Sequence, residues 1–327
     1  MSSLRHMFGN VFKQPSPATP PNLYTYKTRF SMLGTVGSGK STIASLIVVT
    51  TQTLSSDLPD FYCRVVENTS QIIGDASRIR SGMFPEKTTA YNTYAAEAGL
   101  LLRWGGVWGD KKVQVPICDI AGEDIQFMIQ RFGKNVGEDF STVSYNAAAN
   151  LVAYVKDSDG FIVVVPASKA VIKRGGQLEK ESAELHFDPD VNLHRILNEV
   201  VLHKEQSRGK PIKGIAVVIS KWDLLQPYAE GMGLDVYTPQ GLRDFMDVEF
   251  PATSQLIKSL GMSDRVRFFP SYVDLERDNT GAPKLWPNGS PMIRVKDRDA
   301  SGRPVRRPSY PEQQYVDLIG FLKTFAT

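Results

Sequence analysis

The stretch Gly34-Thr35-Val36-Gly37-Ser38-Gly39-Lys40-Ser41-Thr42 decides how this chain folds. It follows an apolar run at 28–34 that predicts a buried strand, and the residues from Ser41 onward predict a helix. Glycines between a strand and a helix let backbone N–H groups curl around phosphates, and the positive end of the helix adds to the attraction. The pattern G-x-x-x-x-G-K-[ST] in this setting predicts that the loop binds the phosphates of a nucleoside triphosphate.

The residues of this phosphate loop have separate expected tasks. Lys40 is expected to reach the β- and γ-phosphates, and the hydroxyl of Ser41 is expected to ligate Mg²⁺. The alternative is a chance glycine-rich turn before a helix, but the order of strand, loop, lysine, serine and helix counts against it. The expected phosphate site comprises Gly34, Gly37, Ser38, Gly39, Lys40, Ser41 and Thr42.

Apolar, β-branched runs alternate with helical stretches along the rest of the chain. Strands are expected at 99–104, 112–119, 161–166, 214–220 and 265–269. Helices are expected at 144–157, 190–207, 239–247, 252–260 and 311–325. The first two of these strands are separated by a Gly/Asp-rich connector that predicts a hairpin. The alternation predicts an α/β fold in which helices cover both faces of a mostly parallel sheet.

Two further motifs stand directly after predicted strands. In Asp119-Ile120-Ala121-Gly122, the carboxylate of Asp119 is placed to hold Mg²⁺ through water, and the N–H of Gly122 to bind the γ-phosphate. In Ser220-Lys221-Trp222-Asp223, the last carboxylate can accept both N1–H and N2–H₂ of guanine, a pair of donors that adenine lacks. The stem of Lys221 is expected to lie over the base plane. The order of the motifs therefore predicts a guanine nucleotide as the ligand.

With these motifs in this order, the sequence resembles the Ras-like and translation-factor-related (TRAFAC) P-loop GTPases over about residues 28–275 and the terminal helix. The resemblance implies a three-layer P-loop GTPase fold with one antiparallel strand in a mostly parallel sheet. It also implies Mg²⁺ as cofactor, GTP or GDP as ligand, and hydrolysis of GTP. The long segment after Lys40, a P-x-x-T motif and large later insertions resemble GTPase domains of bacterial conflict and double-GTPase systems.

The resemblance assigns two more residues. The first switch of these proteins carries a threonine that completes Mg²⁺ coordination in the triphosphate state, and the candidates in the segment 84–89 are Thr88 and Thr89. By position we choose Thr88 as metal ligand and catalytic residue. A fifth motif that contacts the guanine carbonyl is expected after the last predicted strand, where Ser271 is our choice.

Two departures from the family pattern bear on catalysis. Glu123 stands where many relatives have a glutamine that orients the attacking water, and its negative charge would lie near the γ-phosphate. Val36 replaces the glycine of Ras-like proteins and would crowd an arginine supplied by a partner. Both predict slow intrinsic turnover or a different arrangement for positioning water. Arg78, Arg80 and Lys87 are either a source of positive charge near the first switch or solvated helix residues.

The chain is expected to form one GTPase-like domain over 23–327 after a flexible segment at 1–22. Residues 57–80 have room for an additional strand and helix. A protein effector is expected to contact the switch segments 82–92 and 120–143. The expected insertions lie near 57–80, 120–143, 167–190 and 274–310.

The last insertion contains a basic stretch, 292–308, in which six basic residues face two acidic ones, a local charge of +4. The tip Asp299-Ala300-Ser301-Gly302 predicts a hairpin. Such a hairpin could contact nucleic acid or anionic lipid, but few aromatic residues lie between the charges. An ordinary solvated hairpin is therefore the favoured interpretation.

Composition excludes several classes of protein. The two cysteines, Cys63 and Cys118, exclude a disulfide scaffold, and a formal net charge of +3 does not demand nucleic acid as a partner. The longest apolar runs fall far short of the roughly 18 residues that cross a bilayer, so a cytoplasmic location is expected. The motifs together predict a Mg²⁺-dependent GTPase that acts as a regulatory switch. The alternatives are a GTP-gated binding or self-assembling module with negligible hydrolysis, and an ATPase.

Overall fold

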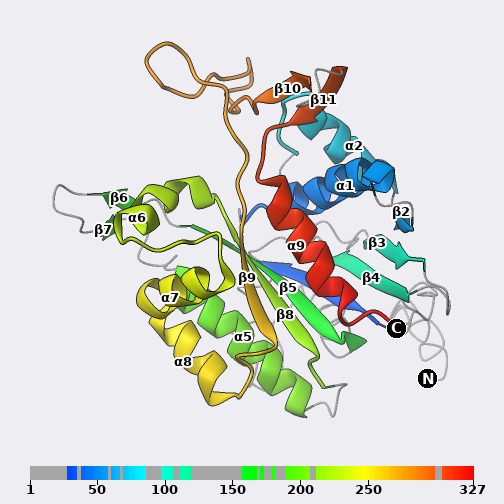
Figure 1. Ribbon diagram of the computed structural model, residues 1–327, viewed down its shortest axis with the longest axis vertical. Helices are drawn as coiled ribbons and strands as arrows, with labels where there is room; N and C mark the ends of the chain where they lie inside the picture. Colours follow the sequence, from blue (N-terminus) through cyan, green and yellow to red (C-terminus); the bar gives the residue numbers. More distant parts are fainter. Residues whose placement is uncertain are drawn as a thin grey trace, which may run out of the picture.

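A central sheet with helices on both faces organises the chain (Figure 1). The computed structural model describes residues 28–34, 38–57, 60–66, 69–85, 97–105, 111–118, 157–167, 170–172, 178–180, 189–206, 211–298 and 304–327. The predicted flexible segment at 1–22, most of the predicted helix at 144–157 and the insertion near 120–143 lie outside these residues. None of the described helices has an apolar stretch long enough to cross a bilayer.

The sheet contains seven strands within the described residues, in the order β2-β3-β4-β1-β5-β8-β9. Strands β4, β1, β5, β8 and β9 run parallel to one another, whereas β3 pairs antiparallel with both β4 and β2. Their bounds are β1 (Phe30–Gly34), β2 (Phe61–Val66), β3 (Glu97–Trp104), β4 (Lys111–Cys118), β5 (Gly160–Pro166), β8 (Gly214–Ser220) and β9 (Val266–Pro270). The predicted hairpin and the predicted fold class, with one antiparallel strand in a mostly parallel sheet, are confirmed.

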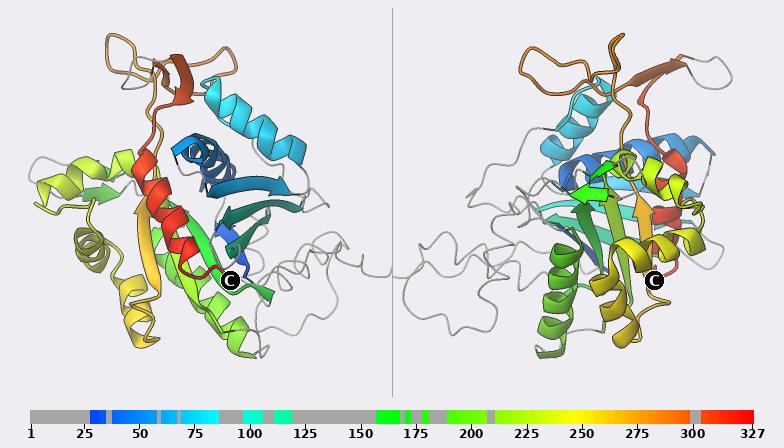
Figure 2. Two further views of the ribbon diagram at one scale, coloured as in Figure 1. Left: turned by 45° about the vertical axis from the view of Figure 1, so that its right-hand side comes forward. Right: turned by 90° about the vertical axis from the view of Figure 1, so that its left-hand side faces the viewer.

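Two buried clusters, one on each face, account for the three layers. Successive strand side chains point to opposite faces, so Met32 packs with α1 and α9 while Leu33 packs with α5, α7 and α8. Figure 2 shows the helices on either side of the sheet. The helices are α1 (Lys40–Asp57), α2 (Thr69–Arg80), α5 (Pro189–Gln206), α6 (Gln226–Gly231), α7 (Pro239–Glu249), α8 (Pro251–Ser259) and α9 (Glu312–Lys323).

Helix α1 is buried around most of its circumference over its first three turns. Ile43 through Val49 are all buried, because the helix packs against α2 and α9 as well as the sheet. A helix in such a place carries apolar residues all round instead of on one stripe. This explains why the sequence after the phosphate loop is almost wholly apolar from Ile43 to Val49, with Ser45 as the one polar residue.

The predicted insertions at 57–80 and 274–310 contain regular structure. Residues 57–80 form the additional edge strand β2 and helix α2, as predicted. The strands β6 (Ala170–Ile172) and β7 (Leu178–Lys180) pair antiparallel within 167–190. The strands β10 (Val295–Arg298) and β11 (Pro304–Pro308) confirm the hairpin predicted in the basic stretch, and β11 contacts α2.

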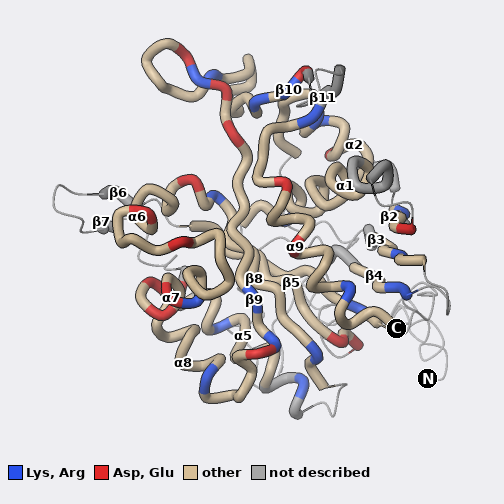
Figure 3. Tube along the Cα trace, in the orientation of Figure 1, with Lys and Arg blue, Asp and Glu red and all other residues tan. Residues whose placement is uncertain are grey.

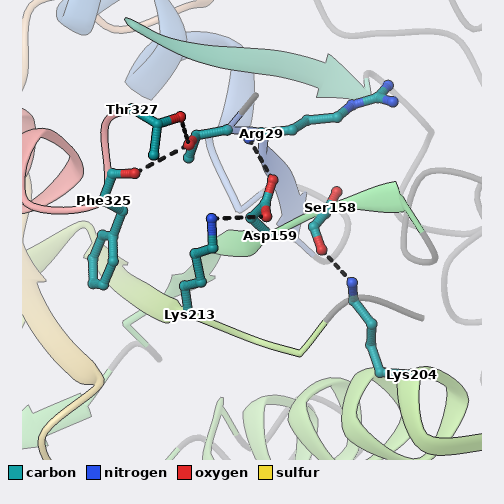
Figure 4. Close-up of polar contacts among 8 residues, drawn as sticks. Arg29, Ser158, Asp159, Lys204, Lys213, Phe325 and Thr327 are labelled. Carbon is teal, nitrogen blue, oxygen red and sulfur yellow. Dashed lines mark hydrogen bonds and ion pairs between the residues drawn. The ribbon is translucent and has the colours of Figure 1, made fainter. Parts of the chain in front are cut away.

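Polar contacts close the edge of the sheet from which its parallel strands start (Figure 4). The Asp159 carboxylate accepts a hydrogen bond from the Arg29 backbone N–H at 3.0 Å and pairs with Lys213 at 3.1 Å. The ammonium group of Lys204 donates to the Ser158 carbonyl oxygen. Because these residues precede or face the starts of β1, β5 and β8, the phosphate loop lies at the opposite edge.

Candidate functional site

The carboxyl ends of the parallel strands bring the sequence motifs to one edge of the sheet. Gly34 at the end of β1 pairs with Val164 of β5, and Ser220 at the end of β8 pairs with Pro166. β1 lies between β4 and β5; the strands that follow it in sequence, β2 to β4, lie on one side of it, and β5, β8 and β9 lie on the other. Ligands of open α/β sheets bind outside the carboxyl ends at such a switch point.

The described part of the phosphate loop is folded tightly around two glycines. The ammonium group of Lys40 donates to the Gly34 carbonyl oxygen at 3.1 Å, and Lys40 is buried. A Cβ atom at Gly34 would lie only 2.6 Å from both the Ser38 hydroxyl and the Val164 carbonyl oxygen. Gly39 has a φ of +85°, a conformation that favours glycine. Position 34 therefore has no room for a side chain, and the backbone conformation at position 39 favours glycine.

The start of α1 offers positive electrostatic potential beside this loop. The helix begins at Lys40, and no acidic residue lies in its first turn. The Ser38 hydroxyl is buried and has no hydrogen-bond partner among the described residues. A buried hydroxyl without a partner next to a helix N-terminus fits an anionic ligand such as a phosphate. Ser41 and Thr42, half-buried in the first turn, lie at the predicted position.

A single hydroxyl connects the phosphate loop to the segment Ser220-Lys221-Trp222-Asp223, which we call the base motif. The Ser220 hydroxyl donates to the Ser38 carbonyl oxygen at 2.6 Å and lies 3.3 Å from the Val165 carbonyl oxygen. Ser220 and Ser38 are 182 positions apart in the chain. The motif S-K-W-D therefore begins on the residue that holds the phosphate loop in place.

Replacing Ser220 with alanine is expected to lower the free energy of unfolding by about 0.5–1.5 kcal/mol, because a buried hydrogen bond is lost. Urea unfolding measures this change. Ser259→Ala is the matched control, since its hydroxyl bonds the Leu256 carbonyl oxygen at an exposed helix end and should cost less than about 0.5 kcal/mol. Equal stability of the two variants would contradict a stabilising hydrogen bond between Ser220 and Ser38.

In the base motif, Trp222 is buried in the core, whereas Lys221 and Asp223 are at least partly exposed. The Trp222 side chain is fully buried against Phe245 of α7, with ring centroids 5.0 Å apart. Lys221 is exposed and adopts φ 56° and ψ 33°, a left-handed conformation that is uncommon for residues other than glycine. Such strain concentrates at binding sites. Because the Trp222 side chain is held in the core, the positions of its two neighbours, Lys221 and Asp223, are fixed as well.

The Asp223 carboxylate is half-buried, and its pKa is raised above the ordinary value of 3.8, chiefly because burial disfavours the charged form. The positive charges of Arg277 and Lys221 lower this pKa, and the Asp274 carboxylate raises it. Asp274 and Arg277 belong to the insertion 274–310. The insertion therefore contributes to the electrostatic environment of the base motif.

Ser271 lies beside the base motif, as expected from the resemblance. Its backbone carbonyl oxygen accepts from the Trp222 N–H at 3.0 Å, and its own N–H donates to the Ile219 carbonyl oxygen at 2.8 Å. Its hydroxyl is 2.6 Å from the hydroxyl of Tyr315 on α9. The arrangement favours contact between the backbone of this segment and a bound base over contact from the Ser271 hydroxyl.

Several predicted site residues lie outside the described residues, and their roles stay predictions. They are Gly37 of the phosphate loop, Thr88 and Thr89 of the first switch, and Asp119, Gly122 and Glu123 after β4.

The donor set expected for Mg²⁺ fits that ion chemically. Ser41, Thr88 and Asp119 offer oxygen atoms, the ligands that Mg²⁺ prefers. Met32 of β1 pairs with Ile117 of β4, so Asp119 follows in sequence a strand that ends beside the phosphate loop. Within the described residues, no group of three or more His, Cys, Asp or Glu side chains could hold a metal.

Of the basic residues near the predicted first switch, Arg78 makes a structural contact. The Arg78 side chain donates from Nε to the Phe84 carbonyl oxygen at 3.2 Å, which ties the end of α2 to the following segment. Arg80 is half-buried on the same helix, and Lys87 lies outside the described residues. The contact of Arg78 favours a role in holding the backbone here.

Sequence reasoning did not anticipate three features of the site. The hydrogen bond from Ser220 to Ser38 could have been suspected from the sequence, because Ser220 is the first residue of the base motif. The contact of Tyr315 with Ser271 could not, because the two residues are 44 positions apart. The influence of Arg277 on Asp223 likewise depends on how the insertion folds back.

Comparisons with known proteins give only weak matches at low identity. No protein-family model matches the sequence, and no curated protein matches it significantly. A crystal structure of sup35 complexed with GDP matches 81% of this chain and 42% of its own, with 12% identity and a TM-score of 0.29. The S. cerevisiae Ski7 GTPase-like domain, bound to GTP, matches 81% and 47%, with 10% identity and a TM-score of 0.32. The chain spans less than half of the length of either structure.

Proposed function

We propose that this chain binds GTP with Mg²⁺, hydrolyses it to GDP and phosphate, and acts as a regulatory switch. The observation that carries the proposal is the hydrogen bond from Ser220 to the Ser38 carbonyl oxygen. It joins a loop of phosphate-binding pattern to a motif that recognises guanine. Two patterns that are far apart in the sequence thus lie within reach of one nucleotide.

Recognition of guanine falls to the base motif. The Asp223 carboxylate accepts hydrogen bonds from N1–H and N2–H₂ of guanine, while the stem of Lys221 covers the base plane. Adenine offers no such pair of donors and would leave a half-buried carboxylate without partners, which is costly. The site should therefore strongly prefer GTP over ATP.

Hydrolysis depends on positioning and on electrostatic stabilisation of the γ-phosphoryl group. Lys40 turns from the Gly34 carbonyl oxygen to the β- and γ-phosphates, and backbone N–H groups of the loop and of Gly122 bind the remaining oxygens. Ser41, Thr88 and Asp119 would hold Mg²⁺, which would supply positive charge to the phosphates.

The turnover is proposed to be slow. Glu123 accepts a hydrogen bond from the attacking water, but its negative charge repels the γ-phosphate, and Val36 crowds the place of an arginine from a partner. These two residues also favour a second candidate, a GTP-gated binding module with negligible hydrolysis. In either case the effector would contact the switch segments 82–92 and 120–143, in the cytoplasm. Contact of 292–308 with nucleic acid or a membrane stays the less favoured alternative to an ordinary solvated hairpin.

The first experiment measures binding of labelled GTP, GDP and ATP to the purified protein with Mg²⁺, followed by release of phosphate in a single turnover. Tight binding of GTP and GDP with slow release is the expected result. Guanine binding without release would favour the binding module. A preference for ATP would contradict the assignment of Lys221 and Asp223.

A further inference from the structure

The insertion 274–310 starts and ends beside the base motif. The Asp274 N–H donates to the Ser309 carbonyl oxygen at 2.9 Å, and the Ser309 hydroxyl donates to the Asp274 carboxylate. The Arg294 N–H donates to the Asp274 carbonyl oxygen at 2.8 Å. Three hydrogen bonds of Asp274 therefore hold the two ends of the insertion together near the end of β9.

The middle of the insertion is held to the end of α2. One backbone carbonyl oxygen, that of Gly82, accepts from the Ile293 N–H at 2.8 Å and from the Trp286 indole N–H at 3.1 Å. Gly82 has a φ of +85°, and a Cβ atom there would lie 3.0 Å from the Ile293 carbonyl oxygen. Ile293 is buried in the cluster that contains Ile79 of α2. Only glycine allows so close an approach without strain.

Backbone hydrogen bonds run along the insertion between these two ends. The Lys284 N–H donates to Glu276, the Met292 N–H to Lys284, and the Glu276 N–H to Met292, each at 2.8–2.9 Å. Arg277, in the same part, acts electrostatically on Asp223. Hydrogen bonds thus connect Gly82 with Asp274, whose carboxylate acts electrostatically on Asp223 of the base motif.

Gly82 is also where the predicted first switch segment, 82–92, begins. Its neighbours are held locally, since the Met83 N–H donates to the Arg78 carbonyl oxygen at 2.9 Å and Arg78 Nε donates to Phe84. The start of the segment is therefore fixed from two directions. One is the end of α2, and the other is the insertion.

The distribution of charges in the insertion favours contacts within the chain over binding of a polyanion. Figure 3 shows acidic and basic residues mixed along the insertion and β10. Arg307 of β11 pairs with Glu312 of α9 at 3.2 Å. The net positive charge of the basic stretch is thus partly met by the protein itself.

We propose that the insertion 274–310 is a brace that positions the start of the first switch segment relative to the base motif, with Trp286 as its positioning residue. The brace slows release of the nucleoside triphosphate. The inference rests on the proposed function, because a first switch engages the nucleotide most closely in the triphosphate state. Loosening the brace should therefore affect GTP more than GDP.

The test is Trp286→Phe, which keeps an aromatic ring but removes the N–H that donates to Gly82. Dissociation of a labelled, non-hydrolysable GTP analogue is expected to accelerate about three- to tenfold, the effect of one hydrogen bond, and that of GDP less than about twofold. Leu285→Ala is the matched control, because Leu285 is the exposed neighbour in the same loop. It should change neither rate.

A second variant, Gly82→Ala, strains the same contact from the other side and should accelerate release of the GTP analogue in the same direction. Equal acceleration of both nucleotides, or rates unchanged in both variants, would overturn the brace while leaving the proposed function standing. Failure of the unaltered protein to bind either guanine nucleotide would instead overturn the proposed function, and the brace with it.

Discussion

Lys40→Ala is expected to weaken binding of Mg²⁺·GTP by about 100-fold or more, because charge-assisted hydrogen bonds to two phosphates are lost from a buried site. The Lys40 ammonium group is buried and faces the loop interior, where it bonds the Gly34 carbonyl oxygen. Its charge therefore acts on the phosphates with little screening by solvent. Fluorescence titration with a labelled GTP analogue measures the affinity.

The matched control for Lys40→Ala is Lys258→Ala, which removes the same charge from the surface. Lys258 is exposed and pairs with Asp247 at 2.8 Å, so its loss should leave GTP affinity within about twofold. Thermal unfolding of both variants without nucleotide shows whether they are folded. An affinity of Lys40→Ala within about threefold of the unaltered protein would remove Lys40 from the phosphate site.

Asp223→Asn is expected to lower GTP affinity by about 100- to 1,000-fold, because an amide cannot accept both donors of guanine. The same variant should gain affinity for xanthosine triphosphate, whose base offers N1–H as a donor and a carbonyl oxygen as an acceptor. An asparagine side chain complements that pair. Competition of each nucleotide against a labelled GTP analogue measures both changes.

The raised pKa of Asp223 adds a pH dependence to this prediction. Only the carboxylate accepts both donors, so GTP affinity should fall as the pH drops toward the pKa of Asp223, beginning above the range of an ordinary aspartate. If Asp223→Asn bound GTP as tightly as the unaltered protein, the assignment of the base motif would be wrong.

Most strands and helices of the described residues follow from local patterns, but the short elements β6, β7 and α6 were not predicted. The runs at 161–166 and 214–220 are apolar and β-branched because both faces of β5 and β8 are buried. The phosphate loop could also be predicted from the sequence, since its glycines, lysine and serine lie within eight consecutive residues, Gly34 to Ser41. Bounds differed by a few residues, as for β3, which begins at Glu97 and not at residue 99.

What the sequence by itself determined is the fold class and the place of the phosphate-loop and base-motif patterns, because each depends on residues close together in the chain. The tertiary structure alone decided which distant residues hold these parts in place. Ser220 meets Ser38 across 182 positions, and Trp286 meets Gly82 across 204. A hydroxyl or an indole N–H finds its partner through the packing of whole elements, and no pattern of neighbouring residues encodes that partner.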